Sequence, residues 1–182
     1  MKTESTALYV ARLAVTLLLI TAVVAALLAG VNAITKPAIE ALTAQKTQNA
    51  IMAVLPGGGE EMADFPATDL VSKVYTSDLG YAVEVTPGGF DNTITMMVGI
   101  DKEGNILGID IIKHTETAGL GAVADAETPA GISFREQFAG MSGTVSVSKD
   151  GGEVEAITGA TITSRAICAG VNAALECVGK MG

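Results

Sequence analysis

The sequence predicts an α+β protein with a single N-terminal transmembrane helix followed by one extracytoplasmic domain. Three observations predict this class. Residues 13–34 form a long apolar run without a charged side chain, and later segments show the alternating hydrophobicity of β-strands. The chain then ends on a segment with helical periodicity. At 182 residues, the chain has room for one compact domain beside the membrane helix.

The apolar run at residues 13–34 is long enough to cross a membrane. As a helix it spans about 33 Å, and the hydrocarbon core of a bilayer is about 30 Å thick. A cleaved secretory signal is the alternative, because Val31-Asn32-Ala33 offers small residues to a signal peptidase. The apolar part of a signal is about 7–15 residues long, which favours an uncleaved anchor. We therefore expect residues 1–12 in the cytoplasm and the domain on the outer side of the inner (cytoplasmic) membrane.

Small residues recur at helical spacing along the anchor, at Ala22, Ala26, Ala29 or Gly30, and Ala33. Such a face lets the backbones of two helices approach closely in lipid, which favours a partner membrane subunit. The alternative is that Ala and Gly are simply common in membrane helices.

After the anchor, the sequence predicts a helical linker over residues 35–60 and a domain over residues 61–182. Pro37 suits the first turn of a new helix just outside the membrane, and Gly57-Gly58-Gly59 is expected to end that helix. The strands are expected at residues 70–76, 80–85, 93–100, 106–112 and 143–148, with a hairpin turn at 101–105. Helices are expected at residues 132–138 and 164–178.

Composition excludes several kinds of protein. The net charge of −9 argues against a nucleic-acid partner, because phosphate contacts need a basic surface. Cys168 and Cys177 are too few for a disulfide scaffold or an iron–sulfur site. Their spacing places them on opposite faces of the last helix, so free and partly buried thiols are expected. His114 is the only histidine, and no metal site is expected.

The segment Thr158-Gly159-Ala160-Thr161-Ile162-Thr163-Ser164 precedes the last predicted helix. Small residues and hydroxyl groups here allow backbone N–H and side-chain O–H groups to converge on an anion. A helix N-terminus adds about half a positive charge, so phosphate binding is physically natural. The alternative is that Thr163 or Ser164 simply caps the helix.

A second segment, His114 to Gly121, follows the predicted strand at 106–112. Gly119 and Gly121 allow the backbone to approach a flat ligand closely or to adopt a positive φ. Taken alone, the segment is a tight loop after a strand.

Together the two segments resemble motifs of one family. The run ITGATITS is similar to the flavinylation motif Ser/Thr-Gly-Ala-Thr, and HTETAGLG is similar to His-x-Glu-Thr-Pro-Gly-Leu-Gly of the same proteins. The family is the FMN-binding domain shared by the G subunit of the Rnf complex and the C subunit of the sodium-translocating NADH:quinone oxidoreductase. The resemblance runs from the anchor to the last helix. Ala118 departs from the usual Pro, and Glu155 departs from the Asp that usually begins the flavinylation motif.

The resemblance implies a covalently attached FMN. A flavin transferase would move FMN from FAD onto the hydroxyl of Thr161 and form a phosphoester. No base that could activate this poor nucleophile is evident beside Thr161 in the sequence, so an external enzyme is expected. The residues implied around the flavin ring are His114, Glu116, Thr117, Leu120 and Gly121. Those implied around the phosphate are Thr158, Gly159, Ala160, Thr163 and Arg165.

The resemblance also implies an electron-relay subunit of an ion-translocating ferredoxin:NAD+ oxidoreductase, associated with other membrane and peripheral subunits. We expect neither a catalytic residue nor an independent NAD or ferredoxin site, since the chain lacks the Gly-rich strand–helix fingerprint of dinucleotide binding. The alternative within the family is the quinone-reductase subunit. A membrane-anchored scaffold or non-redox ligand-binding domain, with the Thr cluster serving as a helix cap, is the alternative of another class.

Overall fold

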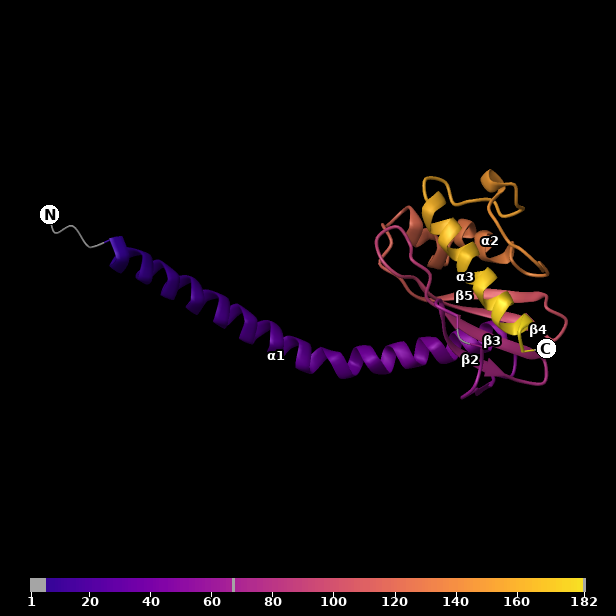
Figure 1. Cartoon of the computed structure of the whole chain (residues 1–182), viewed down its shortest axis with the longest axis horizontal. Coiled ribbons are helices and arrows are strands. Elements are labelled where there is room, and N and C mark those ends of the chain that lie inside the picture. The colour runs from indigo at the N-terminus through magenta and orange to yellow at the C-terminus, as the bar shows by residue number, and fades with distance from the viewer. Residues whose placement is uncertain (1–5, 67, 182) are drawn as a thin grey trace. The chain divides into compact units, whose positions relative to one another are not determined.

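A computed structural model describes residues 6–66 and 68–181. It combines helices with one antiparallel sheet, which confirms the α+β class, and it divides into two units between Leu42 and Thr43. The elements are α1 (Thr6–Val54), β1 (Glu60–Glu61), β2 (Val71–Thr76), β3 (Gly80–Val85), β4 (Thr95–Asp101), β5 (Ile106–Lys113), η1 (Gly121–Asp125), α2 (Pro129–Glu136), η2 (Ser148–Asp150) and α3 (Thr161–Gly179) (Figure 1).

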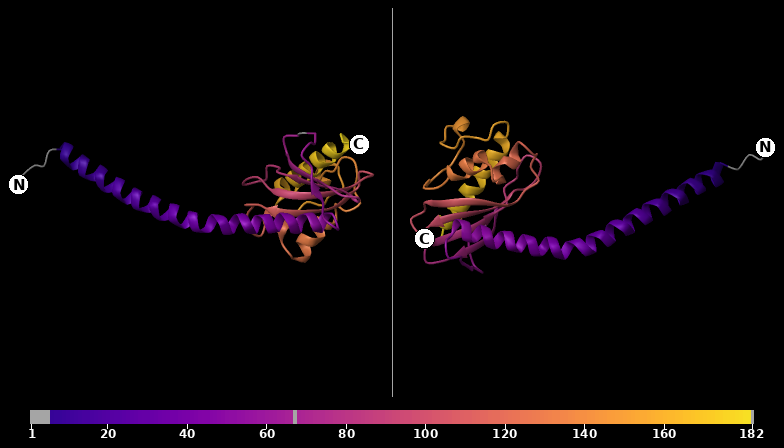
Figure 2. Two further views of the ribbon diagram at one scale, coloured as in Figure 1. Left: turned by 90° about the horizontal axis from the view of Figure 1, so that it is seen from below. Right: turned by 180° about the vertical axis from the view of Figure 1, so that it is seen from behind.

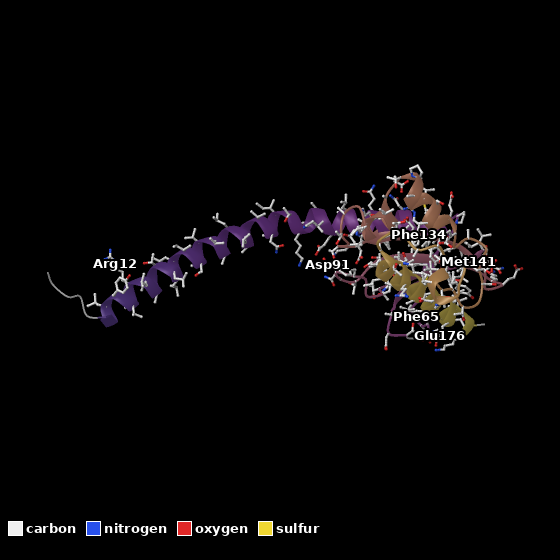
Figure 3. All side chains as sticks on the ribbon, turned by 90° about the horizontal axis from the view of Figure 1, so that it is seen from above. Arg12, Phe65, Asp91, Phe134, Met141 and Glu176 are labelled. Carbon is white, nitrogen blue, oxygen red and sulfur yellow. The ribbon has the colours of Figure 1, made fainter. Side chains whose placement is uncertain are left out.

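Helix α1 exposes its apolar side chains along the predicted anchor. Leu17 and Leu18 are 64% and 66% exposed, and side chains project from all sides of this part of the ribbon (Figure 3). Thr21 donates its hydroxyl back to the Leu17 carbonyl at 3.0 Å, which satisfies a polar group within an apolar segment. Among the described residues, α1 is the one helix long and apolar enough to cross a membrane. It is therefore a candidate membrane span.

The helix does not restart at Pro37 as predicted, because Pro37 lies inside α1. Good helix formers surround the proline, and Lys36 and Glu40 form an ion pair one turn apart at 3.7 Å. The far end of α1 is also held by packing, since Ile51 and Val54 are buried. Both effects oppose the break that a proline tends to cause.

The five strands form an antiparallel meander in chain order, and helices cover both of its faces (Figures 1 and 2). On one face, Ile167 and Val171 of α3 pack into the same core as Val83. On the other face, Val54 of α1 packs in a second core with Met97. Since β4 is buried on both faces, its sequence is almost continuously apolar rather than alternating.

The predicted hairpin turn between β4 and β5 is confirmed. Both oxygen atoms of the Asp101 carboxylate accept hydrogen bonds across the turn, from the side chain of Asn105 at 2.9 Å and from the N–H groups of Asn105 and Glu103 at 2.8 and 2.9 Å. These bonds, led by that from the Asn105 side chain, hold the pKa of Asp101 below its ordinary value. Gly104 completes the turn with a φ of +86°.

The helix expected at residues 132–138 begins earlier, at Pro129, and ends at Glu136. Thr128 caps it, because its hydroxyl oxygen accepts a hydrogen bond from the N–H of Gly131 at 3.3 Å. Proline is favoured directly after such a cap, since its missing N–H has no helical partner there. The Thr-Pro pair is therefore the local signal that sets the start of α2.

The strand predicted at residues 143–148 is wrong. Val145 donates to the side-chain oxygen of Asn172 at 2.8 Å, and the Asn172 amide nitrogen donates back to the Val145 carbonyl at 2.8 Å. A side chain of α3 thus takes the place of a neighbouring strand. Within the segment, Val147 alone forms a bridge, with Val154.

Cys168 and Cys177 are both free, as predicted, and both are buried. Burial raises the pKa of Cys168 to about 11. At neutral pH this thiol therefore stays protonated and serves as a packing group rather than a nucleophile.

Candidate functional site

A cavity of about 270 Å³ brings together segments that are distant in the sequence. The segments are the loop after β3, the loop after β5 with the start of η1, η2, and the turn before α3 with the first turn of that helix. The residues that line the cavity are Phe90, Glu116, Thr117, Leu120, Gly121, Lys149, Gly159, Ala160, Thr161, Ile162 and Thr163. Both motifs singled out in the sequence therefore meet at one place.

Glu116 forms part of the buried wall of this cavity and is 7% exposed. Its Oε1 atom accepts hydrogen bonds from the N–H groups of Phe90 at 2.9 Å and Asp91 at 3.3 Å. Its Oε2 atom accepts a hydrogen bond from the Thr163 hydroxyl. A buried carboxylate is costly unless it is hydrogen-bonded, and three donors satisfy it here. Glu116 thereby ties two loops to helix α3.

Helix α3 begins at Thr161, three residues before the predicted start at Ser164. Ala160 occupies the N-cap position and has no side-chain oxygen to offer. The interpretation of Thr163 or Ser164 as the cap is therefore wrong. Ser164 instead accepts a hydrogen bond from the N–H of Ile157 at 3.0 Å, which folds the preceding turn onto the helix. The helix start has no side-chain cap, so its N–H groups can bind an anion.

The three threonines of the segment 158–164 have different environments. Thr161 lines the cavity, and its Oγ1 atom accepts a hydrogen bond from Lys149 Nζ at 3.2 Å. Thr163 is 2% exposed, and its hydroxyl is engaged with Glu116. Thr158 is exposed and lines a separate cavity of about 340 Å³. Thr161 therefore presents the most accessible hydroxyl of the three to the shared cavity.

Eight of the residues expected at the flavin site line this cavity, namely Glu116, Thr117, Leu120, Gly121, Gly159, Ala160, Thr161 and Thr163. The lining does not include the other three, His114, Thr158 and Arg165. His114 accepts the N–H of Glu116 at 3.2 Å and lies 3.5 Å from a carboxylate oxygen of Asp125. Arg165 forms a two-point ion pair with Asp150, with both distances 2.7 Å.

Three residues of the cavity were missed in the sequence, namely Phe90, Lys149 and Ile162. Phe90 and Ile162 are 65% and 52% exposed, and Leu120 beside them is 43% exposed. Exposed apolar side chains around a cavity are typical of a site that covers an apolar ligand. Ile162 lies within the recognised motif and could have been included, whereas no local pattern marks Phe90 or Lys149.

This arrangement fits a flat, partly apolar ligand with an anionic group. The exposed apolar side chains suit a ring system, and the uncapped first turn of α3 suits a phosphate. Among the described residues, no cluster of three or more His, Cys, Asp or Glu side chains could hold a metal ion. The cavity thus defines a candidate binding site for a ligand of this kind. Residues 89–176 match the FMN-binding domain family.

Two relatives resemble nearly the whole chain. The G subunit of the Na+-translocating ferredoxin:NAD+ oxidoreductase complex of Acetobacterium woodii is 34% identical, over 91% of this chain and 89% of the relative. The G subunit of the ion-translocating oxidoreductase complex of Methanosarcina acetivorans is 33% identical, over 93% of this chain and 94% of the relative. The chain belongs to this family of FMN-binding G subunits.

Proposed function

We propose that this chain is the electron-relay subunit of a membrane-bound, ion-translocating ferredoxin:NAD+ oxidoreductase. The similarity to two G subunits over nearly their whole length supports this function, and so does the match to the FMN-binding domain family. The apolar helix α1 supplies a means of attachment to the membrane part of such a complex. Bound FMN would supply the chemistry, since it can accept and return one or two electrons.

The FMN is attached covalently to Thr161 in this proposal. The observation that carries it is the contrast between the motif's threonines: Thr161 is partly exposed and lines the cavity, while Thr163 is buried and bonded to Glu116. Thr158 lines a different cavity. A phosphoryl donor that enters the shared cavity would therefore meet the Thr161 hydroxyl.

The attachment reaction consumes FAD and needs a flavin transferase as a partner. Thr161 Oγ1 would attack the phosphorus of the FMN half of FAD, so that a new P–O bond forms while the P–O bond to AMP breaks. AMP would leave, and the hydroxyl proton would pass to the transferase. In the assembled complex, electron entry and exit would belong to other subunits.

The chain's own residues would hold the attached flavin in two ways. Exposed Phe90, Leu120 and Ile162 would cover the apolar ring and exclude water from it. The first turn of α3 would bind the phosphate through its N–H groups. Glu116 would hold the two loops and helix α3 in fixed positions around the ligand through its hydrogen bonds.

We further propose that α1 stays uncleaved and that the domain lies on the outer side of the cytoplasmic membrane. The length and exposure of the apolar helix support an anchor. A covalent bond would also prevent loss of FMN from that side of the membrane.

The relay function is tested in the assembled complex. Thr161→Ala removes the attachment hydroxyl, so the variant complex is expected to assemble but to lose ferredoxin-dependent NAD+ reduction. Thr158→Ala is the matched control, because Thr158 is an exposed threonine outside the shared cavity. Wild-type electron transfer by the Thr161→Ala complex would refute the proposed role.

A further inference from the structure

Lys149 is a cavity residue that neither motif contains. It lies on η2, and its Nζ atom donates a hydrogen bond to Thr161 Oγ1 at 3.2 Å. A lysine ammonium group has three N–H donors and no free lone pair. It therefore cannot take the proton of the Thr161 hydroxyl in this state, but it can bind an oxygen atom of a group that arrives at Oγ1.

An ion pair lies next to Lys149 in the chain. Asp150, the following residue, accepts Arg165 Nε and Nη2 at 2.7 Å each. Arg165 lies one helical turn after Thr161 on α3, so consecutive residues of η2 contact consecutive turns of one helix. Since Arg165 engages both oxygen atoms of Asp150, this carboxylate is already paired with a cation other than Lys149.

The negative net charge of the chain favours a cation beside a phosphate at Thr161. The chain carries 20 acidic and 11 basic residues, so its overall field opposes a phosphate. Among the described residues that line the cavity, Lys149 is the one basic side chain and Glu116 is the one acidic side chain. The oxygen atoms of Glu116 are hydrogen-bonded to other groups. Lys149 is therefore the charged side chain of the cavity that can bind the phosphate.

We infer that Lys149 binds the phosphoryl group during its transfer to Thr161 and in the finished phosphodiester, and that the Asp150–Arg165 pair positions it. This inference rests on the proposed attachment of FMN to Thr161. During transfer, the bond from Oγ1 to phosphorus forms while the bond from phosphorus to AMP breaks. The ammonium group stabilises the negative charge on the phosphoryl oxygens and keeps its own protons.

The test measures the initial rate of covalent flavin incorporation into the detergent-solubilised full chain, with FAD and a flavin transferase. Lys149→Met keeps the length of the side chain without its charge and is expected to lower the rate about tenfold or more. Lys149→Arg is expected to stay within about threefold, because it retains a cation that can donate to a phosphate. Lys102→Met is the matched control, since it removes an exposed charge from the β4–β5 turn and should not change the rate.

A second readout separates phosphate binding from docking of the transferase. In the fully flavinylated chains, the ³¹P resonance of the phosphodiester should shift in Lys149→Met and should stay unchanged in Lys102→Met. A wild-type rate in Lys149→Met would overturn the inference, and so would a slow rate combined with an unshifted resonance. If the wild type itself acquires no flavin, the proposed attachment fails and the role of Lys149 fails with it.

The positioning role of Asp150 has its own signature. Asp150→Asn should slow incorporation in the wild-type background but should have no further effect in Lys149→Met, because the two changes act through one group. Additive losses in the double variant would show that Asp150 acts independently of Lys149 and would overturn this part of the inference.

Discussion

Glu116 fits its site because two nearby residues have no side chain. A Cβ atom at Gly89 would lie 2.3 Å from Oε1 of Glu116, and one at Gly121 would lie 2.5 Å from Oε2. Both distances are too short for non-bonded atoms, so the carboxylate can occupy this position only while both residues are glycine. The loop glycine at 121, which the sequence marks as a site of close approach, therefore approaches the protein's own carboxylate.

Glu116→Gln is expected to lower the free energy of unfolding by about 1–3 kcal/mol. The amide keeps the length of the side chain but places N–H donors where the carboxylate accepts from the backbone or from Thr163. The measurement is denaturant unfolding of the full chain in detergent. Glu155→Gln is the control and should change stability by less than about 0.5 kcal/mol, because Glu155 is exposed and bonds Gln137 through backbone atoms. Equal losses in the two variants would contradict the role of Glu116.

The sequence predicts the part of the site that lies within short continuous motifs. Thr161 and Glu116 are found in this way, because each stands in a recognisable run of small residues and glycines. Lys149 could not be found, since one lysine in a polar segment is ordinary and its distance to Thr161 depends on how η2 folds onto α3. The ion pair of Arg165 with Asp150 could not be predicted for the same reason, because it is a tertiary contact that spacing does not reveal.

Among the elements, segments with a clear period of two were predicted most accurately. The strand expected at 80–85 has the bounds of β3, because its residues alternate between the two covered faces of the sheet. The segment at 143–148 alternates equally well but has no strand beside it, since the side chain of Asn172 satisfies its backbone. Periodicity indicates which side chains of a segment are buried, but it does not identify the group that forms hydrogen bonds with the backbone of that segment.

The packing of α1 on the sheet depends on Gly99. A Cβ atom at Gly99 would lie 2.3 Å from the carbonyl oxygen of Val54, whereas one at Gly108, its partner across β4 and β5, would meet nothing within 4 Å. Gly99→Ala should therefore lower the free energy of unfolding by about 1–3 kcal/mol, and Gly108→Ala should leave it unchanged or slightly raised. Comparison of the urea midpoints of the two variants checks this. A Gly99→Ala variant with the urea midpoint of the wild type would show that the close contact between Gly99 and the end of α1 is not needed for stability.

At the scale of the whole molecule, the chain combines an exposed apolar helix with a domain whose sheet is covered on both faces. The sequence predicts this combination, because an uncharged run of that length and an amphipathic final helix are strong signals. The helix that the sequence predicts after Pro37 is present as the continuation of α1 to Val54. The burial of Ile51 and Val54 was not predictable, because it arises only after the sheet has formed.

The proposed topology predicts a specific pattern of proteolysis. Protease added to intact cells after removal of the outer envelope should digest the domain and leave a membrane-protected fragment that contains residues 13–34. The N-terminus of the mature chain should remain ahead of that run. Full protection of the domain, or a mature N-terminus near Ile34, would show that the topology is wrong.

The most direct test of the central claim is the intact mass of the full chain, purified from cells that also express a flavin transferase. The wild type should gain one FMN less one water, and Thr163→Ala should keep this adduct because Thr163 is not the attachment residue. Thr161→Ala should show the unmodified mass alone. An unmodified wild type, or an adduct that persists in Thr161→Ala, would contradict covalent attachment of FMN at Thr161.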